Sequence, residues 1–148
     1  MAASSALPAR SVVHVSAPSA SIVLAGRILY VLIFLMAGFG HYSKQTIGYA
    51  ASQGVPVSSI LVPLSGVVAL IGALSILLGY HAKLGAWLIA LFLIPVTFSM
   101  HKFWTVSDPM TMQMQMAMFM KNLSMLGGAL LITQFGAGPL SFDARAKN

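Results

Sequence analysis

The sequence predicts an all-α integral membrane protein. Four apolar helices form an antiparallel bundle with both chain ends in the cytoplasm, and a short interfacial helix lies between spans one and two. Of the 148 residues, 58% are hydrophobic and only 7% are charged, whereas soluble proteins carry about 25% charged residues. The mean hydropathy is +0.89. The apolar runs lack the period-2 alternation of barrel strands, so helices must satisfy the backbone within lipid.

Four apolar runs have the length of a bilayer crossing, which takes about 20 helical residues. They cover residues 21–40, 59–79, 83–100 and 117–135. The second and third are joined only by residues 80–82, so they form a tight hairpin. Pro95 is expected to kink the third helix, because proline removes one helical hydrogen bond.

Two capping signals set the connections. Asp108 before Pro109 suits an N-cap followed by the first helical position, so the fourth helix starts before the apolar run and extends about 27 residues. Ser43 could cap a short interfacial helix that ends at Gly54, because Pro56 prevents its continuation.

Packing between the helices should depend on small residues, since lipid supplies no hydrophobic drive between spans. The candidates are Gly66, Ala69, Gly72, Ala73, Ser124, Gly127 and Gly128.

The basic residues indicate the orientation. One side of the predicted membrane collects Arg10, Arg27, Lys83, Arg145 and Lys147, and the other Lys44, Lys102 and Lys121. By the positive-inside rule both termini are cytoplasmic. Residues 1–20 are a flexible tail, residues 21–143 the membrane domain, and residues 144–148 a second tail.

Composition also excludes several kinds of site. The net charge is +6, but the basic residues stand singly at the ends of apolar runs, so the expected surroundings are lipid and not nucleic acid. There is no cysteine, which removes disulfides, thiolate metal sites and dithiol relays.

Antiparallel threading brings scarce polar side chains together at the outer end of the bundle. The candidate ligand-binding residues there are His41, His101, Trp104, Lys121 and Asn122. Lys121 lies inside a span, where a charged group suggests a function, although it could equally snorkel to the interface. Either histidine alone could be an ordinary interfacial residue, and Trp104 could belong to the aromatic belt.

Three further polar residues are given structural roles. Arg27 is expected to snorkel or to pair with Asp143 at the cytoplasmic end, and Asp108 is the helix cap described above. The alternating run from Met110 through Met112 and Met114 offers soft thioether ligands for Cu(I), but that spacing scatters sulfurs around a helix, so no metal site is expected and copper is a minor alternative.

Several short stretches resemble the DoxX/DoxD family of small four-helix bacterial membrane proteins. They are residues 26–27, 34–38, 54–56, 70–73, 77–79, 101–104, 108–109, 119–123 and 127–128. The resemblance covers about residues 24–143. It implies a multi-pass protein of the bacterial cytoplasmic (inner) membrane. It also implies a link to redox chemistry, since the namesake is a subunit of a thiosulfate:quinone oxidoreductase.

We therefore expect an accessory redox-linked subunit that binds a quinone or similar small amphipathic molecule at the outer end, beside a partner subunit or a second copy. The chain would be at most a membrane subunit of a quinone-linked oxidoreductase, because it has no nucleotide motif or deep haem-ligand pair. The alternatives are a small transporter, an outward-facing copper-handling protein and an assembly scaffold.

Overall fold

The computed structural model describes residues 19–146, which form helices joined by short turns. Four helices are long and apolar enough to cross a membrane: α1 (Ala20–Gly40), α3 (Ser58–Leu78), α4 (Ala82–Met100) and α5 (Pro109–Phe135). Three are short: α2 (Lys44–Ser52), the 3-10 helix η1 (Phe103–Thr105) and α6 (Phe142–Arg145). No strand occurs in residues 19–146, and the predicted all-α, four-span fold is confirmed. Most of the predicted N-terminal tail, and residues 147–148, lie outside the described residues.

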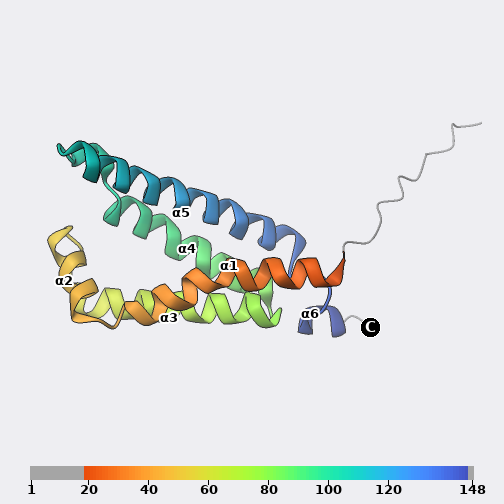
Figure 1. Ribbon diagram of the computed structural model, residues 1–148. Helices are drawn as coiled ribbons and strands as arrows, with labels where there is room; N and C mark the ends of the chain where they lie inside the picture. Colours follow the sequence, from red (N-terminus) through yellow and green to blue (C-terminus); the bar gives the residue numbers. More distant parts are fainter. Residues whose placement is uncertain (1–18, 147–148) are drawn as a thin grey trace, which may run out of the picture.

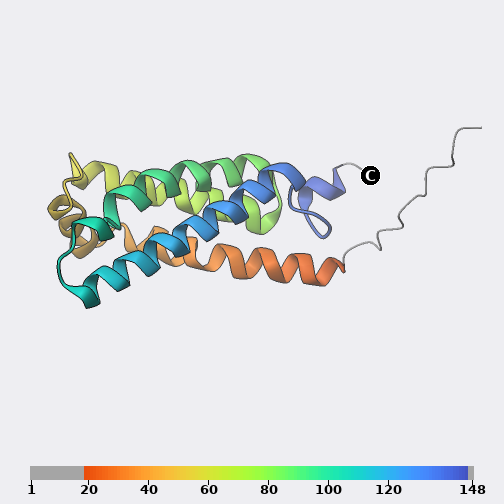
Figure 2. The same ribbon diagram turned by 90° about the horizontal axis from the view of Figure 1, so that it is seen from above.

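The four long helices run alternately up and down an elongated bundle (Figures 1 and 2). One end, which we call the termini end, holds the start of α1, the α3–α4 turn and residues 135–146 (Figure 1). The opposite end, the α2 end, holds α2 and the connection from α4 to α5 (Figure 1). The α2 end is the one that the charge rule predicts to face outward, and this sidedness stays a prediction.

The predicted caps are present. Asp108 accepts a hydrogen bond from the backbone of Thr111, and Pro109 is the first residue of α5. The Thr111 hydroxyl also donates to the Asp108 carboxylate, and these hydrogen bonds hold the pKa of Asp108 below its usual value. Ser43 caps α2 by accepting from Thr46. These local signals depend on neighbours three residues away, so the sequence could show them.

Helix α3 is central to the bundle, because it packs against α1 on one side and α4 on the other, while α5 packs on α4. Helix α5 also reaches α1 through Tyr30, whose hydroxyl donates to the Met125 carbonyl at 2.8 Å. The core between the spans is apolar, and its fully buried members include Val31, Phe34, Ile76, Ile89 and Leu93.

Small residues let α3 approach both neighbours. A Cβ on Gly72 would lie 2.9 Å from the Gly85 carbonyl of α4, and one on Gly66 would lie 2.9 Å from the Gly38 carbonyl of α1. Ala69 and Ala73 are completely buried. The expectation for small residues therefore holds in α3. It does not hold for Gly127 of α5, where a Cβ would meet nothing within 4 Å.

These contacts predict the effect of one methyl group. Gly72→Ala should lower the free energy of unfolding of the purified protein by about 1–3 kcal/mol, because the Gly85 backbone cannot move without separating α3 from α4. The matched variant Gly127→Ala adds the same methyl group in open space and should be neutral or slightly stabilising, since alanine favours helix. Thermal unfolding in detergent would measure both. Equal loss of stability in the two variants would contradict this packing.

Candidate functional site

A cavity of about 760 Å³ lies at the α2 end, and we call it the α2 cavity. Residues of α2 cover it, and the facing parts of α3 and α4 form its long walls. The walls are apolar, with Leu61, Leu64 and Val68 from α3 and Leu88, Leu91 and Val96 from α4. Its size falls within the range of small-molecule sites, which is about 300–1,000 Å³.

The cavity exists because α3 and α4 touch at one level and separate further along. Near the hairpin, Gly72 and Gly85 bring the two backbones together. Towards the α2 end, Gly66 instead packs against Gly38 and His41 of α1. Helix α3 thus leans on α1 there, and residues beyond this point line the space between α3 and α4.

The cavity is open to the side of the bundle. Leu64 and Leu91 line it and are also 55% and 61% exposed. Both leucines lie within helices long and apolar enough to cross a membrane, so we expect this opening to face hydrocarbon. A molecule could therefore reach the cavity from within the bilayer.

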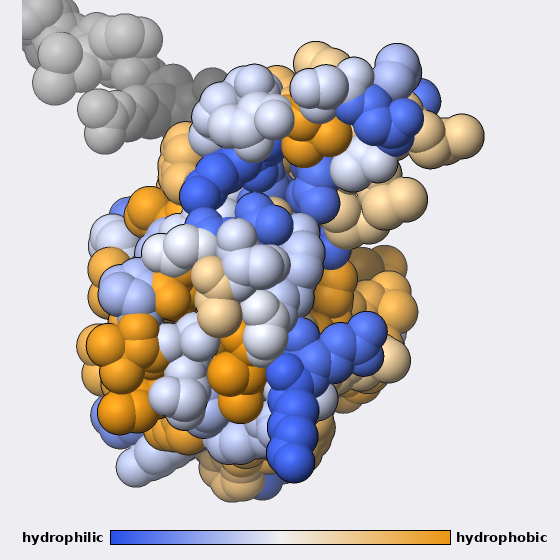
Figure 3. Space-filling model, turned by 90° about the vertical axis from the view of Figure 1, so that its left-hand side faces the viewer, coloured by the Kyte–Doolittle hydropathy of each residue, from blue (hydrophilic) through white to orange (hydrophobic). Residues whose placement is uncertain are grey.

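The polar residues of the cavity gather towards α2 and the ends of the spans. They include His41, Tyr49, Gln53, His101 and Lys102. Seen from the α2 end, hydrophilic side chains lie among apolar ones and gather around a recess (Figure 3). The cavity thus combines a long apolar wall with a polar end.

Hydrogen bonds hold this polar end together. His101 Nδ1 lies 2.9 Å from Gln115 Oε1 of α5, and Gln115 Nε2 donates to the Tyr49 hydroxyl of α2 at 3.2 Å. Lys102 Nζ donates to the Gln53 carbonyl at 2.9 Å. These contacts join α2 to α4 and α5, which are distant in sequence.

His41 is fixed by its own helix. It is the C-cap residue of α1, and its Nδ1 bonds to the Ala37 carbonyl. Its ring meets Phe92 of α4 edge to face, with the ring centroids 5.6 Å apart. His41 and His101, both predicted as ligand-binding residues, therefore line the same cavity.

The other three candidate residues do not line the α2 cavity. Trp104 is exposed and packs on Phe103 and Phe119, as an interfacial aromatic residue would. Lys121 is exposed on α5, and Asn122 is buried, at 5% exposure. Their proposed part in ligand binding stays a prediction.

Three polar residues of this region were missed in the sequence. Tyr49 and Gln53 looked like ordinary positions of an interfacial helix, and Gln115 lies within the methionine run. Only the packing of α2 over the ends of α4 and α5 gives them a common role.

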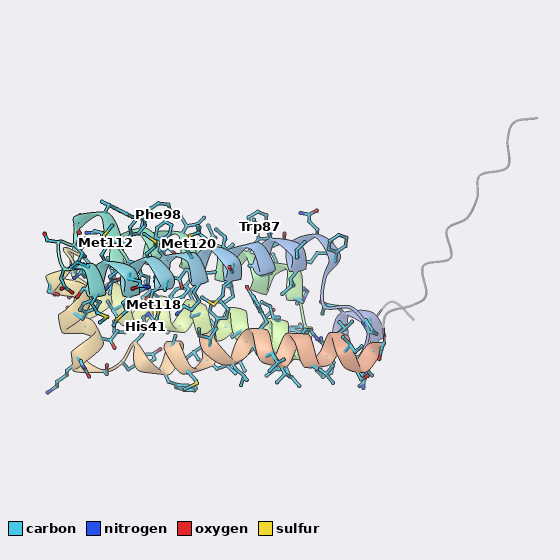
Figure 4. All side chains as sticks on the ribbon, turned by 45° about the horizontal axis from the view of Figure 1, so that its top comes forward. His41, Trp87, Phe98, Met112, Met118 and Met120 are labelled. Carbon is cyan, nitrogen blue, oxygen red and sulfur yellow. The ribbon has the colours of Figure 1, made fainter. Side chains whose placement is uncertain are left out.

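The methionine run lies on α5 and is exposed at Met110, Met112 and Met114. Figure 4 shows Met112, Met118 and Met120 along the half of α5 nearer the α2 end, with Trp87 in the other half of the bundle. Neighbouring methionines two positions apart are about 200° apart around a helix axis, so they do not converge on one point. Copper binding stays a prediction without geometric support.

The termini end is closed by the C-terminal segment. Arg27 is buried, at 5% exposure, and its Nη2 donates to the Leu140 carbonyl at 2.6 Å. The predicted alternatives for Arg27 were snorkelling or pairing with Asp143. Asp143 accepts from the backbone N–H groups of His81 and Ala82, at 2.8 and 3.0 Å, and so caps the start of α4. Its negative charge also acts on Arg27, and their pairing stays a prediction.

Asp143 therefore has a structural role that a variant can test. Asp143→Ala should lower stability by about 1 kcal/mol, because two N–H groups at the start of α4 lose their acceptor. Asp143→Asn keeps a side-chain oxygen and should lose less. Thermal unfolding of the two variants measures the difference, and an alanine variant as stable as the unmodified protein would contradict the cap.

Comparisons with known proteins place the chain in a family. A model of the SURF4 family matches residues 4–148. The inner membrane protein YqjF of Escherichia coli (strain K12) is 33% identical over 127 residues, which cover 82% of this chain and 88% of YqjF. The inner membrane protein YphA of the same organism is 29% identical over 126 residues, covering 84% of this chain and 89% of YphA.

A eukaryotic relative is also similar. The ER-derived vesicles protein ERV29 of Saccharomyces cerevisiae is 29% identical over 126 residues, which cover 85% of this chain but only 34% of ERV29. No solved structure matches.

These findings correct the family suggested by the sequence motifs. The resemblance to the DoxX/DoxD family is wrong, because the matching family model is SURF4. The stretches that suggested it are short, and six of the nine contain glycine or alanine, which recur in many membrane helices because they allow close packing. The predicted multi-pass location in an inner membrane is confirmed by the four apolar helices and the two bacterial relatives. The chain belongs to the SURF4 family.

Proposed function

We propose that this protein binds one small amphipathic molecule in the α2 cavity. The single observation that carries the proposal is the cavity itself, with apolar walls on α3 and α4 and a polar end at His41, His101 and Lys102. An amphipathic molecule would place its apolar part between the two helices and its polar head beside α2.

The side opening supports this proposal. Because the walls reach the lipid-facing surface at Leu64 and Leu91, a membrane-dissolved molecule needs no aqueous path. Such sites are mostly apolar, with a few polar groups that fix orientation, and the α2 cavity has this composition.

The redox part of the sequence-based hypothesis has lost its main support. It depended on the DoxX/DoxD resemblance, and the family is SURF4. A quinone remains one member of the class of small amphipathic molecules, and it is a useful probe for that reason. A role as an oxidoreductase subunit is not part of the proposal.

The transporter alternative receives no support from the described core. A transport path needs polar groups through the whole thickness of the membrane, whereas the buried polar residues of the described spans are few: Arg27, Thr97, Asn122 and Thr133. Flux into liposomes above that of empty vesicles would revive this alternative.

The partner subunit or second copy also stays a prediction. Helix α5 has the smallest buried share of the four spans, so it is the helix on which a partner would most readily pack. A scaffold role would depend on that face and not on the α2 cavity.

A cavity-filling variant tests the proposal. Ser99 lines the α2 cavity and is half-buried, so Ser99→Phe should occupy part of it and reduce the amount of small amphipathic molecule that co-purifies in mild detergent. We expect a loss of about tenfold or more in occupancy, since a blocked site loses most of its apolar contact. Solvent extraction followed by mass spectrometry of the extract would measure it.

The matched control is Ser124→Phe, which adds the same ring at an exposed position of α5 outside the cavity. It should leave occupancy unchanged. If the unmodified protein carries no such molecule and takes up none from added quinone, fatty acid or fatty alcohol, the proposed function is wrong.

A further inference from the structure

We propose that the molecule held in the α2 cavity is a single-chain amphiphile with an anionic head, of the fatty-acid carboxylate class. The inference rests on the proposed function and adds the charge and shape of the ligand. It follows from the ionisable groups of the cavity, from the hydrogen-bonding capacity of the histidine nitrogens that have no protein partner, and from the shape of the walls.

The charges of the cavity are of one sign. Besides Tyr49, its ionisable residues are His41, His101 and Lys102, and no acid lines it. The whole chain has only two acids, Asp108 and Asp143. Asp108 caps α5 and Asp143 caps α4 at the termini end. Lys102 therefore has no carboxylate of the protein beside it in the cavity, and an anionic head would supply one.

The hydrogen bonds of the histidines narrow the choice of head. A backbone carbonyl can only accept, so His41 Nδ1 carries the proton that binds Ala37. Gln115 donates to Tyr49 through its nitrogen, which leaves its oxygen to accept from His101 Nδ1. Both rings thus use their Nδ1 protons within the protein. Their Nε2 atoms have no hydrogen-bond partner among the described residues.

A neutral ring with its proton on Nδ1 has an Nε2 that only accepts. Such a ring can bind a hydroxyl but cannot donate to a quinone carbonyl. A protonated ring donates from both nitrogens, and it can then bind an anion at Nε2. Lys102 has three N–H donors and donates one to the Gln53 carbonyl, so two N–H groups remain for the same anion.

Both rings lie at helix C-termini. His41 is the C-cap of α1, and His101 is the C-cap of α4. The carbonyl groups at a helix C-terminus carry partial negative charge and stabilise a nearby cation. An anionic head beside Lys102 would be attracted by its positive charge.

The walls suggest one chain and not two. The cavity has one apolar space, between α3 and α4, with its polar end at α2. A single alkyl chain can lie in it while the head reaches His101 and Lys102, and a second chain would remain outside.

The test compares heads on the same chain. The full-length protein, in nanodiscs of neutral phosphatidylcholine, would be titrated with oleate, oleyl alcohol and oleoyl lysophosphatidate, and affinities measured by native mass spectrometry. Oleate should bind about tenfold or more tightly than oleyl alcohol, because hydrogen bonds to a charged head are stronger than those to a neutral one. Oleate should also bind at least as tightly as the lysophosphatidate.

Variants of the basic residues locate the effect. Lys102→Gln should remove most of the preference for oleate, and Lys102→Arg should keep it. Since Lys102 also holds Gln53, His101→Gln is a second variant with the same expected loss. The matched control is Lys44→Gln, which removes the same charge from an exposed position at the α2 end that does not line the cavity and should leave the preference intact.

Each result decides between distinct conclusions. Equal binding of oleate and oleyl alcohol, or an unchanged preference in Lys102→Gln and His101→Gln, overturns the anionic head and leaves the proposed function standing. Tighter binding of lysophosphatidate than of oleate overturns the carboxylate in favour of a phosphate head. Failure of every probe to bind overturns the proposed function as well.

Discussion

The close contact of α3 with its two neighbours is the constraint on which the rest of the structure depends. Apolar helices that already lie in lipid gain no hydrophobic free energy by associating with one another. The spans therefore associate where small residues allow their backbones to touch. Gly72 provides this contact with α4, and Gly66 provides it with α1. Because the two glycines lie at different levels of one helix, α3 is held to α4 near the hairpin and to α1 nearer α2.

The α2 cavity is the result of this arrangement. Helices α3 and α4 touch at the level of Gly72 and Gly85, and towards the α2 end α3 packs on α1 instead. The space that opens between α3 and α4 there can be filled by a ligand, by lipid or by side chains. Here the side chains at the separated level leave about 760 Å³ open. Helix α2 then closes the end of the space, held by Lys102 and by the path from Tyr49 through Gln115 to His101.

The polar groups at the two ends of the bundle have different surroundings. At the termini end, Arg27 binds Leu140, and Asp143 caps α4, so polar groups there are used to hold the C-terminal segment against the spans. At the α2 end, the histidine Nε2 atoms and two protons of Lys102 are left over after the internal contacts are made. The termini end also has spare donors, since Arg27 Nε and Nη1 have no hydrogen-bond partner among the described residues. The function is placed at the α2 end because the spare groups there border a cavity with long apolar walls, as a binding site requires.

The sequence by itself determined the membrane class, the four spans to within one or two residues at most ends, and the caps at Ser43 and Asp108. These depend on composition, run length and neighbours a few residues apart. It also indicated that His41 and His101 lie at the same end, because alternate threading requires it. Only the tertiary structure decided that both line one cavity while Lys121 and Trp104 do not, and that Asp143 caps α4. The physical reason is that the rotation of each helix, and the level at which it crosses its neighbour, are set by glycine contacts between distant residues.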